Sequence, residues 1–172
     1  MSGISRYSYF KQILEKGPII LLVISVLNEF DLNYLNLKYF SFNFPFILIY
    51  YWSLKKPDSI GYGLIFVTGL FNDAVVGLPI GISALAYLLI CGFSAYLRNI
   101  TLRPSLIKDW FFFGFTILVV NSVIYVILSL FFNVQILYEG VLVNILFTFL
   151  FYVIFSNVFD YYQKLVFGGP HV

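Results

Sequence analysis

The chain has 172 residues, of which 61% are hydrophobic and only 10% are charged. Soluble domains are about a quarter charged, and a water-soluble fold of this size could not cover so much apolar surface with polar side chains. We therefore predict an all-α integral membrane protein, one polytopic domain covering residues 1–172, with the lipid bilayer as its solvent. The net charge of +2 says little about partners, and we expect no nucleic acid among them.

Apolar runs along the chain predict about six transmembrane helices in a compact bundle. The predicted spans are 18–35, 40–54, 60–76, 80–97, 110–132 and 136–159. The last two runs are long and unbroken, whereas the first two are weaker, because their apolar cores are short. No small-x-small cleavage site follows the first run, so we expect it to be retained as a helix.

The positions of the charges test this count independently. With six spans, nine of the ten Lys and Arg residues fall on one side of the membrane, and only Lys38 falls on the other, near Glu29 and Asp31. Because positive residues stay on the cytoplasmic side, both termini are predicted to be cytoplasmic. Removing any one span would scatter this partition.

The third and fourth runs are separated only by the segment Gly77-Leu78-Pro79. Gly77 provides conformational freedom at the bend, and Pro79 cannot donate a hydrogen bond within a helix. The sequence therefore predicts a tight helical hairpin here.

Small residues recur at multiples of four through this hairpin, and those before the proline are expected to share one helix face. They are Gly61, Gly69, Asp73, Gly77 and Gly81. Small residues at this spacing allow another membrane helix to approach closely. Two hypotheses follow: the stripe packs against the protein's own bundle, or it docks the transmembrane helix of a partner.

Polar residues within the predicted spans carry further hypotheses. Asp73 lies about one turn from the Gly77 bend, so it can brace or cap the hairpin beside water, form an interhelical hydrogen bond, or handle protons or ions. Asn121 and Asn144 are typical of amides that join membrane helices. Alternatively, these two residues line a polar ligand pocket together with Asn72 and Asp73.

Sequence signals of an enzyme are missing. There is one cysteine, Cys91, and one histidine, His171, with no phosphate-binding loop and no paired carboxylates suited to acid–base chemistry. We expect no catalytic residue, no cofactor and no metal site. A further possible function is that of a lipid-modifying membrane enzyme, but the sequence offers no candidate catalytic group for it.

One block of sequence carries a resemblance. It contains Tyr50-Tyr51-Trp52 at the end of a span, Pro57 in the following turn, and the hairpin pattern Gly69-Leu-x-x-Asp73-x-x-x-Gly77-x-Pro79-x-Gly81-x-x-Ala84-Leu85. This block resembles the MreD family of rod shape-determining proteins, with Ile80 in a place where leucine is more usual. Asn144 also stands where that family tends to carry asparagine.

The resemblance implies a non-enzymatic subunit of the bacterial cell-elongation (rod) complex in the inner membrane. Such a protein would bind MreC, act with MreB, RodA and the elongation-specific class B penicillin-binding protein, and so regulate peptidoglycan synthesis and cell shape. On this topology Pro57 lies in a cytoplasmic turn.

The alternative is the substrate-binding membrane subunit of a vitamin-type transporter. The chain is similar in size and helix count to the substrate-capture subunits of energy-coupling-factor transporters, and can share their fold. Those subunits usually carry an Ala-x-x-x-Ala pattern near the first helix, and residues 19–27 contain no alanine.

Overall fold

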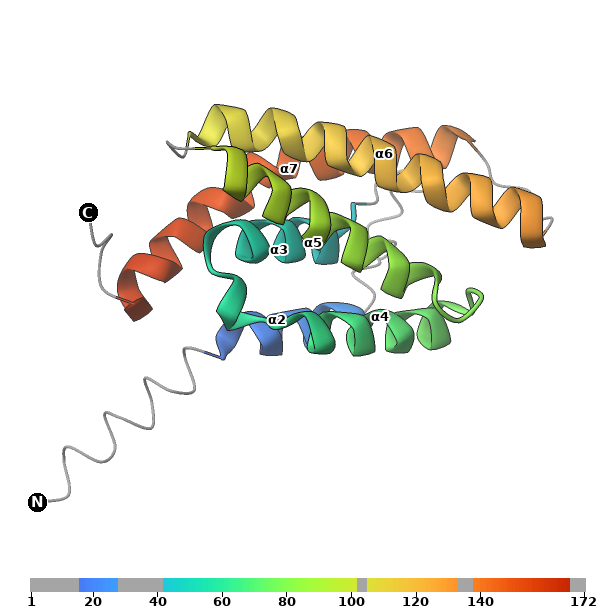
Figure 1. Cartoon of the computed structure of the whole chain (residues 1–172), viewed down its shortest axis with the longest axis horizontal. Helices are drawn as coiled ribbons and strands as arrows, with labels where there is room; N and C mark the ends of the chain where they lie inside the picture. Colours follow the sequence, from blue (N-terminus) through green and yellow to red (C-terminus); the bar gives the residue numbers. More distant parts are fainter. Residues whose placement is uncertain (1–15, 28–41, 102–104, 133–137, 168–172) are drawn as a thin grey trace, which may run out of the picture.

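The computed structural model describes residues 16–27, 42–101, 105–132 and 138–167. In these ranges all regular structure is helical, which confirms the predicted all-α class (Figure 1). The helices are α2 (Gly17–Leu27), α3 (Phe44–Lys55), the short 3-10 turn η2 (Pro57–Ser59), α4 (Tyr62–Val76), α5 (Ile82–Ile100), α6 (Leu106–Phe132) and α7 (Tyr138–Phe167).

Three of these helices, α5, α6 and α7, are long and apolar enough to cross a membrane. Helices α2, α3 and α4 have 11, 12 and 15 residues. At 1.5 Å per residue they measure about 17 to 23 Å, less than the roughly 30 Å of a hydrocarbon core. The described residues therefore show three candidate spans, and the second half of the predicted first span, 28–35, lies outside them together with Lys38.

Several helix ends differ from the predicted spans. Helix α6 begins at Leu106 and α7 ends at Phe167, so both extend beyond the apolar runs 110–132 and 136–159. The reason is that the added turns are held by polar contacts that hydropathy does not register. Asp160 and Gln163 in α7, for example, accept hydrogen bonds from the Tyr51 hydroxyl at 2.5 and 3.2 Å.

The helices form layers, with α6 and α7 along one side, α2 and α4 along the opposite side, and α3 and α5 between them (Figure 1). Helix α3 contacts α2, α5 and α7. Its residues 47–52 are completely inaccessible to solvent. This agrees with its sequence, which is apolar or aromatic on every side, a pattern typical of a helix buried all round.

Local signals define the start of α3. The side chain of Asn43 accepts a hydrogen bond from the Phe46 N–H at 3.2 Å, and Pro45 lies in the first turn, where no intrahelical donor is needed. The Asn43 N–H donates to the hydroxyl of Thr148 in α7 at 2.8 Å. The polar start of a buried helix is thus satisfied by protein groups.

Aromatic rings join α3 to the α6–α7 layer. The ring of Phe113 lies 4.9 Å from that of Tyr50 and 4.5 Å from that of Tyr152, centroid to centroid. Tyr50 and Tyr152 are themselves 5.6 Å apart in an edge-to-face arrangement. The three rings, one from each helix, are fully buried.

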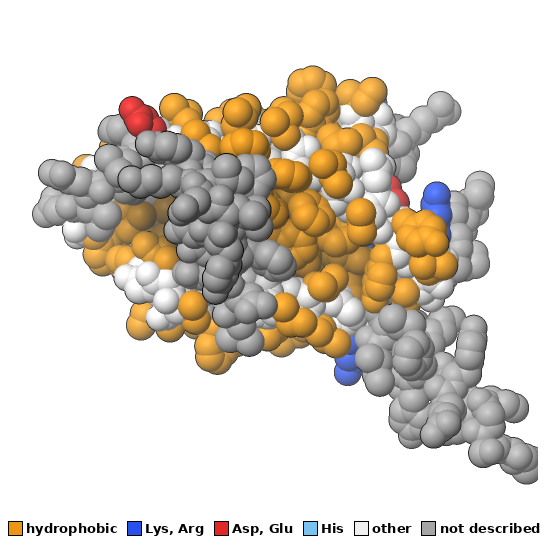
Figure 2. Space-filling view, turned by 180° about the vertical axis from the view of Figure 1, so that it is seen from behind, with side chains coloured by type: hydrophobic (Ala, Val, Ile, Leu, Met, Phe, Trp, Pro, Cys, Tyr) orange, Lys and Arg blue, Asp and Glu red, His pale blue; other side chains and the backbone are white. Residues whose placement is uncertain are grey.

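The outer surface is apolar as well. Along α7 a stripe of exposed side chains repeats every four residues, with exposed fractions of 49–64% at Leu142, Leu146, Leu150, Ile154 and Val158. Figure 2 shows hydrophobic side chains over most of the described surface on one side of the molecule. A surface of this kind is suited to lipid rather than to water.

Replacing Phe113 with alanine should lower the stability by about 3 kcal/mol, because the lost ring leaves a cavity between three helices. Phe131→Ala is the matched control, since Phe131 is 76% exposed and should cost about 0.5 kcal/mol or less. Thermal unfolding in detergent measures both variants. Equal losses would contradict the central position of the Tyr50, Phe113 and Tyr152 rings.

Candidate functional site

The α4–α5 hairpin is held by the carboxylate of Asp73, which is completely buried. Its Oδ2 accepts a hydrogen bond from the Gly81 N–H at 2.7 Å, and its Oδ1 accepts one from the Ser83 N–H at 2.8 Å. Asp73 therefore caps the first turn of α5, where the helix dipole favours negative charge. Of the roles considered for this residue, contacts are observed for two, bracing of the hairpin and an interhelical hydrogen bond, from the Ser83 N–H of α5 to Asp73 of α4, and the side chain is inaccessible to solvent.

Close helix packing occurs at Gly69. A Cβ atom built at this position would fall on the backbone of Ala84 in α5, 2.6 Å from its nitrogen. No substituent fits between backbones that lie so close together. Gly69 thus allows α4 to pack against the first turns of α5, within the protein's own bundle.

Gly61 and Gly77 were expected to share a helix face with Gly69, but both lie outside α4, so this part of the sequence interpretation is wrong. Gly61 precedes α4, Gly77 ends it and Gly81 precedes α5, with φ angles of 69°, 75° and 106°. A Cβ atom at any of the three would meet no atom within 4 Å. They serve the turns, because left-handed conformations favour glycine, and a spacing of four counted through a turn does not define a helix face.

The connection around Pro79 is short and hydrogen-bonded. The Leu78 N–H donates to the carbonyl of Asp73 at 3.0 Å, which closes the end of α4, and the Ile82 N–H donates to the carbonyl of Pro79 at 3.3 Å. A second side-chain link, from Asn72 Nδ2 to Ser83 Oγ at 2.9 Å, lies beside the Asp73 cap. Asn72 and Asp73 together fix the start of α5.

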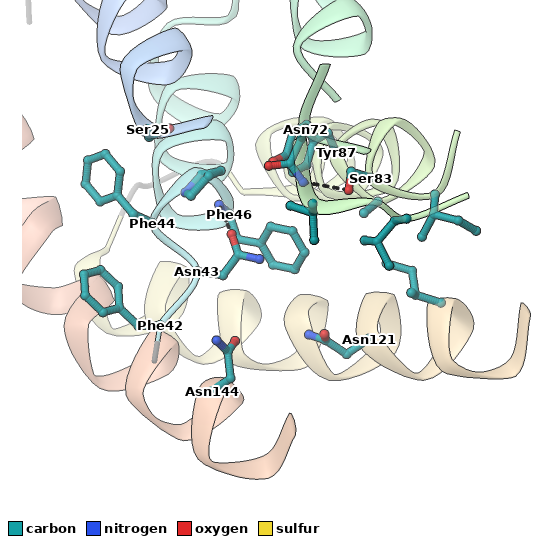
Figure 3. A pocket seen from close by; sticks show the side chains of 16 residues that line it. Ser25, Phe42, Asn43, Phe44, Phe46, Asn72, Ser83, Tyr87, Asn121 and Asn144 are labelled. Carbon is teal, nitrogen blue, oxygen red and sulfur yellow. Dashed lines mark hydrogen bonds between the residues drawn. The ribbon is translucent and has the colours of Figure 1, made fainter. Parts of the chain in front are cut away.

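A cavity of about 530 Å³ lies next to this hairpin (Figure 3). Its lining includes Asn72, Asn121 and Asn144, three of the four residues of the predicted polar pocket. Asp73 is not among the lining residues, since its carboxylate is turned into the helix cap. As a pocket residue, Asp73 was predicted wrongly.

Sequence reasoning missed Asn43 among the described residues that line the cavity. In Figure 3 the side chains of Asn121 and Asn144 extend from α6 and α7 toward the region of Asn43 and Phe46. Asn144 accepts a hydrogen bond from Thr148 at 3.4 Å, and Thr148 in turn accepts from Asn43. The Asn-x-Pro start of α3 is a local signal for a cap, but nothing local indicates that the same residue faces α7.

At the opposite end of α3 lies a second polar cluster. Lys55 forms an ion pair of 3.0 Å with Asp109 of α6, and Arg98 of α5 donates to the carbonyl of Ser53 at 2.9 Å. Tyr51 donates to Asp160 of α7. One end of the bundle therefore contains the C-terminal ends of α3, α5 and α7 and the start of α6. Pro57, the first residue of η2, lies at this end.

Chemically reactive groups are sparse in the parts of the chain that the structure describes. No group of three or more His, Cys, Asp and Glu residues in those parts could hold a metal ion. Cys91 is buried, with its sulfur 3.4 Å from the Ser53 hydroxyl, and so acts as a packing residue. His171 lies outside the described residues.

Comparisons with family models, curated protein sequences and solved structures find no match to this chain. The function is therefore argued from the residues and their arrangement.

Substituting Asp73 with alanine should destabilise the protein by about 2 kcal/mol, because the Gly81 and Ser83 N–H groups lose their acceptor. Asp58→Ala is the control, since Asp58 is an exposed carboxylate in η2. Thermal unfolding of the two variants in the same detergent makes the comparison. A loss at Asp58 as large as that at Asp73 would refute the capping role.

Gly69→Ala should lower the stability by more than about 2 kcal/mol, because the new methyl group would collide with the Ala84 backbone. Gly63→Ala in the same helix should leave stability unchanged or raise it by about 0.5 kcal/mol, since its Cβ atom would meet no neighbour within 4 Å. Unfolding temperatures distinguish the two glycines, and an undisturbed Gly69→Ala variant would exclude the close packing of α4 on α5.

Proposed function

We propose that this chain is a six-span, non-enzymatic subunit of the bacterial cell-elongation (rod) complex, similar to MreD, located in the inner membrane. It would bind MreC and act with MreB, RodA and the elongation-specific class B penicillin-binding protein. The observation that carries the proposal is the hairpin pattern from Gly69 to Leu85. Its polar and small residues each hold a distinct part of the turn, so the pattern specifies a particular hairpin rather than general hydrophobicity.

The arrangement of charge supports the proposed topology. The ion pair of Lys55 with Asp109 and the contact of Arg98 with Ser53 lie at the end of the bundle assigned to the cytoplasm by the positive residues of the sequence. In the proposed arrangement both termini are also cytoplasmic. The cavity and the α4–α5 turn then lie toward the opposite membrane surface.

Helix α3 fits a six-span arrangement despite its length of 12 residues. A spanning segment must have its backbone polar groups satisfied wherever lipid replaces water. Groups of other helices contribute at both ends of α3: the Asn43 N–H at its start donates to the Thr148 hydroxyl, and the Ser53 carbonyl near its end accepts from Arg98 at 2.9 Å. The neighbouring helices, rather than α3 itself, would face the lipid.

The partner surface would lie on the outward faces of the bundle. Gly69 is occupied by Ala84 and cannot receive a partner helix. Outward apolar positions on the same helix, such as Phe71 with 62% of its surface exposed, remain accessible. Substitution of Gly69 therefore tests folding, whereas substitution of outward residues tests partner binding.

Co-purification of the tagged chain from its native membrane in a gentle detergent should recover MreC, with RodA or its penicillin-binding partner, identified by mass spectrometry. A second polytopic membrane protein with the same tag and expression level serves as the control, and should recover none of them. The physical reason is that association through apolar helix faces survives mild extraction.

The cavity favours a second candidate, the substrate-binding subunit of a vitamin-type transporter. Recovery of paired cytoplasmic ATPases and a transmembrane coupling subunit, in place of MreC, would overturn the scaffold proposal and support this one.

A further inference from the structure

The cavity beside the hairpin has the size of a small-molecule site. Its volume of about 530 Å³ falls within the range of roughly 300–1,000 Å³ that such sites occupy. Its described walls come from α2, the start of α3, the α4–α5 hairpin, α6 and α7, so most elements of the bundle contribute to it.

Three asparagines of the lining are each held by the protein at one amide atom. Asn43 accepts through Oδ1 from the Phe46 N–H, Asn72 donates through Nδ2 to Ser83, and Asn121 donates through Nδ2 to the Ile117 carbonyl at 2.7 Å. Within the described part of the chain, the other amide atom of each makes no hydrogen bond. The Nδ2 atom of Asn43, with its N–H donors, and the acceptor Oδ1 atoms of Asn72 and Asn121 are left for a ligand.

Neutral chemistry characterises these walls. None of the described lining residues is Asp, Glu, Lys or Arg. An ionised ligand would meet no opposite charge among these described residues, and burying an unpaired charge is costly. The aromatic side chains of Phe46 and Tyr87, which contact each other edge to face at 6.0 Å, offer flat apolar surface beside the amides.

We propose that this cavity binds an uncharged, flat small molecule that carries both N–H and C=O groups, as a cyclic amide or ureide does. Its N–H groups donate to the carbonyl oxygens of Asn72 and Asn121, and its carbonyl accepts from the amide of Asn43. Its ring lies against Phe46 and Tyr87. The inference does not rest on the scaffold function, since it depends only on the cavity and its amides.

The experiment uses the full chain purified in a gentle detergent. Bound compounds are first released by denaturation and identified by mass spectrometry. Thermal-shift titrations then use uracil, hydantoin and alloxazine as neutral probes, with orotate as the carboxylate analogue of uracil. At saturation a neutral probe should raise the unfolding temperature by about 4 °C, because a ligand that binds only the folded state stabilises it, and orotate should have no effect.

Variants of neighbouring residues on α6 separate this site from unspecific binding. Asn121→Leu should weaken binding of the neutral probe about tenfold, the effect expected for the loss of one buried hydrogen bond. Ser122→Ala is the matched control, because Ser122 makes the same kind of bond to its own helix, lies on the exposed face and does not line the cavity. It should bind as the unaltered protein does.

Four results would overturn the proposal. They are the absence of both a co-purified neutral compound and a thermal shift, equal shifts with orotate and uracil, unchanged affinity in Asn121→Leu, and a phospholipid as the only compound released. Co-purification of MreC is measured separately, so failure of the ligand site and failure of the scaffold function remain distinguishable.

Discussion

The burial of α3 along residues 46–54 is the constraint on which the rest of the structure depends. A helix of 12 residues that is inaccessible along residues 47–52 needs apolar neighbours on every side. Helices α2, α5 and α7 supply that surround, and the rings of Tyr50, Phe113 and Tyr152 connect α3 with α6 and α7. Because α3 contributes little to the outer surface, the longer helices α6 and α7 form much of it, and their outward faces are apolar, as suits contact with lipid.

The two ends of α3 differ in chemistry because different neighbours meet them. At its start, Asn43 lies among amides and aromatic rings around a cavity whose described walls carry no charge. At its end, Lys55 and Ser53 meet Asp109 and Arg98. A buried charge needs a partner, whereas a buried amide needs only neutral donors and acceptors. The charged end therefore closes the bundle, and the neutral end leaves a space that a neutral molecule can fill.

Sequence reasoning predicted the features that local chemistry determines. The helical class follows from composition, and the α4–α5 turn follows from Gly77 and Pro79, with Gly77 in the left-handed conformation. It was wrong about the glycine stripe, because Gly61 and Gly77 lie at the ends of α4, where spacing along the chain does not determine which way a residue faces.

Lengths of apolar runs likewise did not predict that α3 is surrounded by protein, since hydropathy does not distinguish a neighbouring helix from lipid. The Lys55–Asp109 pair and the convergence of Asn43 with Asn144 join residues far apart in sequence, so no local pattern could predict them.

The hairpin and the cavity share one short segment, the first turn of α5. Asp73 holds this turn through the Gly81 and Ser83 N–H groups, and Asn72 holds it through the Ser83 hydroxyl. Gly69 lies one turn before Asp73 in α4 and allows the α4 backbone to approach the backbone of Ala84, the residue after Ser83 in α5. Adjacent residues of α4 thus have separate tasks: Asp73 turns into the helix cap, while Asn72 also lines the cavity. The position of Ser83 depends on both Asn72 and Asp73. The contacts that stabilise the hairpin therefore also determine the shape of the cavity. For this reason a single pattern of small and polar residues at the turn can stabilise the fold and shape a binding site.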